Sequence, residues 1–171
     1  MRQQRGFTLV ELLIVIAIMS ILLVLGVVNL RSGQISARDQ ERKVDVENIM
    51  RGLEGFYINS ANNARYPSTY ISEAGTTDAF VQAALRNIDI KSLQAPGVAA
   101  GTRSLVSATS TNEATTGISP APAPTVSQYI YQPFQPDGTL CTLVSQECRR
   151  YNIFYRLEGD GTIYKASSKN Q

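Results

Sequence analysis

A long apolar run near the N-terminus constrains this chain more than any other feature. Residues 7–30 contain one ionisable side chain, Glu11, and they follow a short leader, residues 1–6, that carries Arg2 and Arg5. A helix of about 24 residues is about 36 Å long, which is enough to cross a hydrocarbon core of about 30 Å. The run therefore predicts a transmembrane helix with the arginines on the cytoplasmic side.

Two simple explanations of this N-terminus are incomplete. The apolar region of a secretory signal peptide is shorter and ends at a small-residue cleavage site, which residues 26–29 do not provide. A plain membrane anchor accounts for the length and for the arginines. It does not account for Glu11, because an ionisable group at membrane depth costs about 2.5 to 3.5 kcal/mol on insertion scales and needs a partner.

The sequence GFTLVE at residues 6–11 resembles the processing site of type IV prepilins and of the related pseudopilins. In that family a short basic leader ends in Gly before Phe, and the fifth mature residue is Glu. The resemblance implies that a prepilin peptidase cuts between Gly6 and Phe7 and methylates the new amine of Phe7. It also implies that the apolar segment is kept as the core of a filament. The resemblance is close over the first third of the chain.

Cleavage would create a partner for Glu11. The new amine of Phe7 is charged, and methylation does not neutralise it. Within one helix the two charges lie four residues apart and are able to pair, but in a staggered bundle the carboxylate of one subunit meets the amine of the next. Neutralisation then depends on the correct axial register, because a missing partner is costly in a low-dielectric setting. We therefore expect Glu11 to serve assembly rather than folding.

Two cysteines, Cys141 and Cys148, lie close together in the C-terminal part, and the chain has no histidine. A zinc finger or a His-dependent metal site is therefore excluded, and we expect no metal and no cofactor. A disulfide would close a loop of about eight residues and stabilise the fold by about 2 to 3 kcal/mol. Two reduced thiols are the alternative. Many type IV pilins have a C-terminal disulfide loop, and this spacing resembles a compact form of it.

Charge gives little information on partners. The precursor has a formal charge of +2, but two of its 16 basic residues lie in the leader, which leaves 14 basic and 14 acidic side chains. A global basic surface for nucleic acid is absent. Arg149 and Arg150 are the local candidates for binding a polyanion, and we expect them to be solvated. The sequence leaves nucleic-acid binding open.

Residues 31–63 continue the apolar segment as an amphipathic helix. Apolar side chains recur there at spacings of three and four and so share one face; they are Val46, Ile49, Met50, Leu53, Phe56 and Tyr57. The two segments together predict a helical spine of about 50 residues. Asn62, Asn63 and Pro67 favour its end. The resemblance implies the same long helix, although many type IV pilins carry a Pro in its apolar half and this chain has none.

Residues 64–127 are expected to be the least regular part. A short helix should begin after a cap at Thr77 or Asp78 and should have one apolar side, formed by Phe80, Val81, Ala84 and Leu85. Residues 97–127 are rich in Ala, Ser, Thr, Gly and Pro, a composition that buries little. They predict a flexible surface loop whose hydroxyls are candidates for O-linked sugars.

Residues 128–171 are expected to form a small antiparallel sheet with a disulfide loop. Strand-like sequence occurs in three segments, residues 129–134, 150–158 and 162–167. Residues 159–161, Gly-Asp-Gly, predict a hairpin turn between the last two. The apolar face of the sheet needs a cover, and the stripe of the spine provides it, so the fold class is α+β. Tyr151 and Tyr155 are expected in the core.

Catalytic motifs are absent from the sequence, which has no G-x-S-x-G, no P-loop and no histidine base, so we do not expect an enzyme. We expect a type IV pilus subunit that forms a homo-oligomeric helical filament through heterologous contacts. The resemblance implies a prepilin peptidase, an assembly platform and minor pilins as partners. It also implies that the chain lies in the inner membrane before assembly and in an extracellular fibre afterwards. A secretion or competence pseudopilin is the alternative within the family, and a monomeric membrane-anchored binding protein is the alternative of another class.

Overall fold

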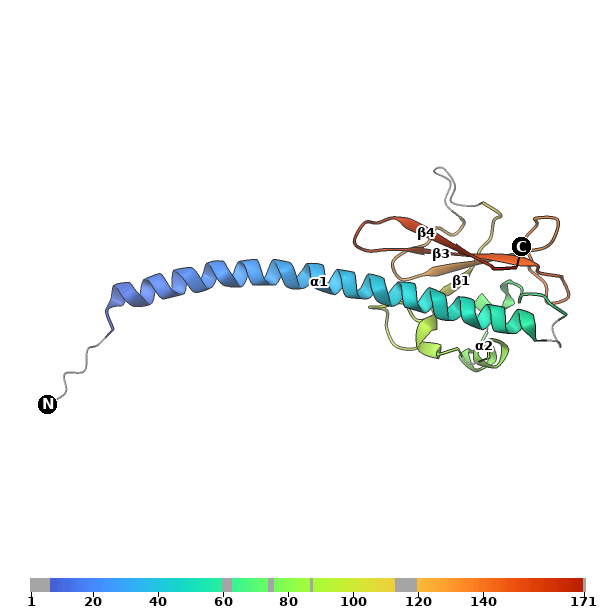
Figure 1. Ribbon diagram of the computed structural model, residues 1–171, viewed down its shortest axis with the longest axis horizontal. Helices are drawn as coiled ribbons and strands as arrows, with labels where there is room; N and C mark the ends of the chain where they lie inside the picture. The colour runs from blue at the N-terminus through green and yellow to red at the C-terminus, as the bar shows by residue number, and fades with distance from the viewer. Residues whose placement is uncertain (1–6, 60–62, 74–75, 87, 113–119, 171) are drawn as a thin grey trace. The chain divides into compact units, whose positions relative to one another are not determined.

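The computed structural model describes residues 7–59, 63–73, 76–86, 88–112 and 120–170. The chain divides into two compact units, Met1–Ala37 and Arg38–Gln171, and each is described by itself below. Helix α1 (Leu9–Ile58) contributes residues to both units (Figure 1).

The first unit consists of the apolar part of α1. Every side chain that the structure describes between residues 7 and 30 is exposed. The helix is long and apolar enough to cross a membrane. Ser20, one of the few polar residues here, donates its hydroxyl to the carbonyl of Ile16 at 2.7 Å, so it adds no unpaired polar group to this surface. The segment therefore has the helical conformation predicted for it and lacks any cover within its own unit.

The second unit begins with the amphipathic part of α1. Its predicted stripe is confirmed, because Val46, Ile49 and Leu53 are buried and the other three members pack against the same core. The helix ends at Ile58, earlier than the predicted residue 63. The predicted Asn turn is present at Asn63, which has a φ of 52°; Asn62 lies outside the described residues.

Three short helices follow, η2 (Thr69–Ser72), α2 (Asp78–Ala84) and η3 (Ile90–Leu93). Thr77 caps α2 as predicted, and its hydroxyl oxygen accepts a hydrogen bond from the N–H of Phe80 at 3.2 Å. Of the predicted apolar side, Val81 and Leu85 are buried, and Phe80 is 43 % exposed. The ring of Phe80 makes an edge-on contact with the exposed ring of Tyr70, with centroids 5.1 Å apart.

The sheet has four strands in the order β1 (Leu105–Ser107), β2 (Tyr129–Phe134), β3 (Arg150–Arg156) and β4 (Ile163–Ser167). The second unit has the predicted α+β architecture, and the three predicted strands pair antiparallel. Strand β1, which was not predicted, pairs parallel with β2, so the whole sheet is mixed. With three residues, β1 is too short to show an alternating pattern.

The two faces of the sheet have different covers. Tyr129, Tyr131, Tyr151 and Ile153 pack with the buried residues of α1, which lies between the sheet and α2 (Figure 1). Tyr151 is in the core as predicted, and Tyr155 packs against it while partly exposed.

The opposite face carries Ile130 and Phe154, which pack with Ala108. The side chain of Gln132, also fully buried there, donates to the carbonyls of Ser110 and Asn112 at 2.7 and 2.9 Å. The prediction that residues 97–127 bury little is therefore wrong for this part of the segment. The physical reason is that the second face of β2 and β3 also carries large side chains, Ile130, Gln132 and Phe154, which need a cover.

Candidate functional site

The predicted cleavage site lies just before α1. Gly6 is outside the described residues, so the structure describes the Phe7 side of the bond alone. Phe7 is 84 % exposed and precedes the first helical residue, Leu9. Phe7, on the mature side of the predicted cut, therefore lies outside the helix.

Glu11 has a partner that the sequence analysis missed. Its Oε2 accepts hydrogen bonds from the backbone N–H and from the hydroxyl of Thr8, both at 2.8 Å. In return, the hydroxyl oxygen of Thr8 accepts from the backbone N–H of Glu11 at 3.2 Å. This reciprocal pair is a capping box, which satisfies two N–H groups at the start of a helix. The T-x-x-E spacing is visible in the sequence and was the signal that could have revealed it.

The capping box leaves part of the carboxylate available. Both bonds to Thr8 use Oε2, and Oε1 has no hydrogen-bond partner among the residues that the structure describes. One oxygen of Glu11 can therefore hold the helix start while the other accepts a bond from an external cation. Local capping and the predicted role of Glu11 in assembly are compatible.

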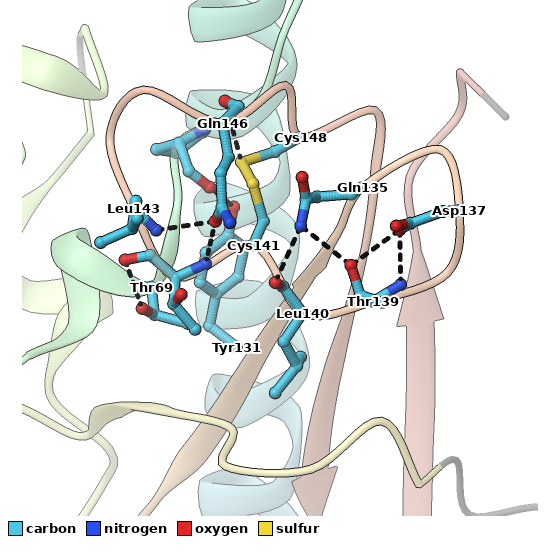
Figure 2. Close-up of a disulfide and its surroundings, with 12 residues drawn as sticks. Thr69, Tyr131, Gln135, Asp137, Thr139, Leu140, Cys141, Leu143, Gln146 and Cys148 are labelled. Carbon is cyan, nitrogen blue, oxygen red and sulfur yellow. Dashed lines mark hydrogen bonds between the residues drawn. A yellow bond between two sulfur atoms is a disulfide. The ribbon is translucent and has the colours of Figure 1, made fainter.

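The predicted disulfide is present between Cys141 and Cys148, whose Cα atoms are 5.7 Å apart (Figure 2). Both cysteines are fully buried. The N–H of Cys141 donates to the carbonyl of Pro133 in β2, and the carbonyl of Cys148 accepts from the N–H of Tyr66 at 2.7 Å. The loop is thereby tied to the sheet on one side and to the segment after α1 on the other.

The tip of this loop is apolar and is held by hydrogen bonds. The side-chain oxygen of Gln146 accepts from the N–H groups of Thr142 and Leu143 at 2.7 and 2.8 Å (Figure 2). Leu143 and the following residue, Val144, are nevertheless 60 and 64 % exposed. This pair could not be identified from the sequence, because two apolar residues in a short loop do not reveal their exposure.

A charged network joins α1 to the turn between β3 and β4. Arg38 donates twice to Glu158, at 2.8 and 2.6 Å, and Asp39 accepts from the backbone N–H groups of Glu158 and Gly159. Arg42, 2 % exposed, donates to Asp39 at 2.8 Å. Burial raises the pKa of Asp39, but the two N–H groups and Arg42 outweigh it and hold the pKa below its ordinary value. The predicted hairpin is thus fastened to the helix.

Asp45 is a second buried acid of α1. It is 7 % exposed and accepts a hydrogen bond from the hydroxyl of Tyr129 at 2.9 Å. Burial raises the pKa of Asp45 to about 7, and nearby Glu41 and Asp89 act in the same direction, against the hydrogen bond from Tyr129 and the charge of Lys91. This carboxyl therefore titrates near neutral pH.

The remaining polar candidates have structural partners. Arg149 donates to the carbonyl of Ala64 and to Glu147, and Arg150 lies over the ring of Phe134 at 4.8 Å. Within the described part of the chain, no group of three or more His, Cys, Asp or Glu side chains is arranged to hold a metal ion.

Comparison with known proteins gives one match. A family model for the prokaryotic N-terminal methylation motif matches residues 1–27. The chain carries this motif. This motif is typical of type IV pilin-like prepilins, which in general are processed by prepilin peptidase and polymerise into pilus-type filaments as structural subunits. No curated protein and no solved structure gives a significant match.

Proposed function

We propose that the chain is a structural subunit of a type IV pilus. It is cut between Gly6 and Phe7, methylated on Phe7, and polymerised through the apolar part of α1 into an extracellular fibre. The observation that supports this most is the methylation motif at residues 1–27, followed by an apolar helix whose described side chains are all exposed. Such a surface needs lipid before assembly and other subunits after it.

In this proposal the polar groups at the start of α1 select the register of the fibre. Lipid tails are as apolar as the helix surface, so moving the helix from the membrane into a bundle brings little hydrophobic gain. Packing and polar pairing then decide which arrangement forms. Oε1 of Glu11, left open by the capping box, accepts the amine of Phe7 from the next subunit, and only one axial stagger brings the two together.

The five segments of the chain have separate roles in this proposal. Residues 1–6 are the leader, residues 7–30 the membrane and core helix, residues 31–63 its amphipathic continuation, residues 64–127 the variable region, and residues 128–171 the sheet with the disulfide loop. The disulfide loop and the long variable region favour a pilus subunit over a secretion or competence pseudopilin. The assembly platform, minor pilins and prepilin peptidase are the partners that this role requires.

Electron microscopy of fibres sheared from cells, with mass spectrometry of their main component, tests this proposal. We expect this chain to be the main component, and deletion of its gene to abolish the fibres. Fibres seen only when the chain is overproduced in a secretion system would favour the pseudopilin. A monomer extracted by detergent from unsheared membranes with its leader intact would contradict polymerisation and favour an anchored binding protein.

A further inference from the structure

The second unit has an apolar surface that projects. Leu143 and Val144, called the loop tip here, are both more than half exposed, and the disulfide and Gln146 fix their position. Val144 borders an apolar hollow of about 80 Å³. Tyr70 and Phe80 line the same hollow and are 41 and 43 % exposed. A rigid loop loses little conformational entropy on binding, so the tip is suited to insertion into a partner.

The same unit has an apolar groove on another face. It lies between α1 and strands β3 and β4 and has a volume of about 740 Å³. Its uncharged lining residues are Val46, Met50, Gly55, Ile58, Tyr155 and Ala166. The charged lining residues, called the charged rim here, are Lys43, Glu47, Arg51, Glu54 and Lys169. An apolar centre with a polar rim is the usual anatomy of a protein–protein interface.

Gly55 lines the groove and leaves open space beside α1. It is exposed within α1, and a Cβ built at this position meets no atom within 4 Å. Gly52, by contrast, is needed for packing, because its Cβ would lie 3.1 Å from the Cβ of Leu85. Gly is a poor helix former, and packing within the described unit gives no reason for it at position 55. The open space there is available to another molecule.

The loop tip and the groove lie on opposite sides of α1. Phe56 lines the hollow beside Val144, whereas Glu54 lines the groove. Side chains two residues apart on a helix project about 200° apart. One copy therefore cannot place its own tip in its own groove. Two different complementary surfaces on opposite sides are what a heterologous, non-closing contact between copies requires.

We propose that the loop tip of one copy docks in the α1–β4 groove of the next copy in the fibre. Leu143 and Val144 enter the groove beside Gly55 and contact Met50 and Ile58, while the charged rim stays at the edge of the contact. This inference rests on the proposed polymerisation and adds to it a contact between the second units.

Site-specific cross-linking tests the contact directly. Benzoylphenylalanine is placed at position 144, the variant is co-expressed with wild-type chain so that fibres form, and the sheared fibres are irradiated. We expect a covalent dimer whose adduct maps to α1 near Met50, because benzophenones react readily with methionine. An adduct elsewhere on the second copy or on another protein, or no dimer in irradiated fibres, would overturn the proposal.

Two variants test its importance. Gly55→Gln fills the groove without an internal clash, and Leu143→Ser with Val144→Ser removes the exposed apolar tip. We expect either to lower the yield of sheared fibres about tenfold, with processing and the disulfide unchanged. Val44→Gln and Val44→Ser are the matched controls, since Val44 is 54 % exposed and lines neither the groove nor the hollow. If the groove and tip variants give wild-type fibre yields, the contact is refuted and the proposed function is not. If the wild-type chain itself forms no fibres, the proposed function is refuted.

Discussion

The apolar part of α1 and the second unit differ in where their apolar side chains find cover. Between residues 7 and 30 every described side chain is exposed, whereas Val46, Ile49 and Leu53 of the same helix are at most 2 % exposed. The second unit has its own core, disulfide and charged network. The described residues of the first have a capping box and no buried side chain. In the proposed fibre, partners cover the first unit, whereas the second unit has a core of its own.

Glu11→Ala should have the largest effect on fibre yield. The variant should still insert and be cleaved, because removing a carboxylate makes the span more apolar. It should enter fibres poorly or not at all, even with wild-type subunits present. Sheared-fibre yield and immunoblots of membrane fractions measure the two steps. Normal yield from cells that express only Glu11→Ala would leave Glu11 as a capping residue.

Thr8→Val separates the two roles of Glu11. It removes the hydroxyl of the capping box but keeps the carboxylate, so the helix start loses about 1 kcal/mol while pairing with the amine remains open. We expect a smaller loss of fibre yield than for Glu11→Ala. Equal losses would mean that capping, rather than pairing between subunits, is what assembly needs.

Arg42→Ala should destabilise the second unit by about 3 to 5 kcal/mol, because it leaves Asp39 buried without its cation. Chemical denaturation of the full-length protein in detergent, followed by tyrosine circular dichroism, measures the change. Arg51→Ala is the control, since its ion pair with Glu47 is exposed and its loss should cost less than about 1 kcal/mol. Similar losses for both variants would contradict the role assigned to the buried network.

Cys141→Ser should lower the stability of the second unit by about 2 to 3 kcal/mol and leave membrane insertion intact. The same denaturation measurement, with and without reductant, checks this value. The wild-type protein should shift with reductant and the variant should not. Two freely alkylatable thiols in native protein would contradict the disulfide.

Asp45→Asn should remove a pH dependence. The carboxyl has a pKa of about 7 in the folded protein against an ordinary 3.8, so the folded state holds an extra proton between these values and stability falls as pH rises from about 4 to about 7. The pKa values of Asp39 and Glu158 are lowered, so their contribution is lost only in more acidic solution. Unfolding free energies at pH 5 and pH 8 should differ less in the variant, and an unchanged difference would contradict the assignment.

Much of the second unit could be predicted from local patterns. The stripe at Val46, Ile49 and Leu53, the cap at Thr77 and the three antiparallel strands follow from spacing and residue type. Strand β1 could not be predicted in this way. It depends on pairing with a strand further along the chain, and it lies within residues 97–127, whose overall composition favours a loop.

The candidate site could be predicted in part. Gly6, Phe7, Glu11 and the cysteine pair have recognisable motifs or spacings. The hydrogen bonds between Thr8 and Glu11 also had a local signal, the T-x-x-E spacing. The exposure of Leu143 and the open space at Gly55 had none, because both depend on how distant elements pack.

The N-terminal peptide of the chain in sheared fibres tests the central claim most directly, since that claim is that the apolar segment is retained and covered by other copies. Mass spectrometry after tryptic digestion should find residues 7–31 as one peptide that carries a methyl group on Phe7. A fibre subunit that begins at Met1 would contradict processing. One that begins after Gly26 would show that the apolar segment is removed and would contradict the account.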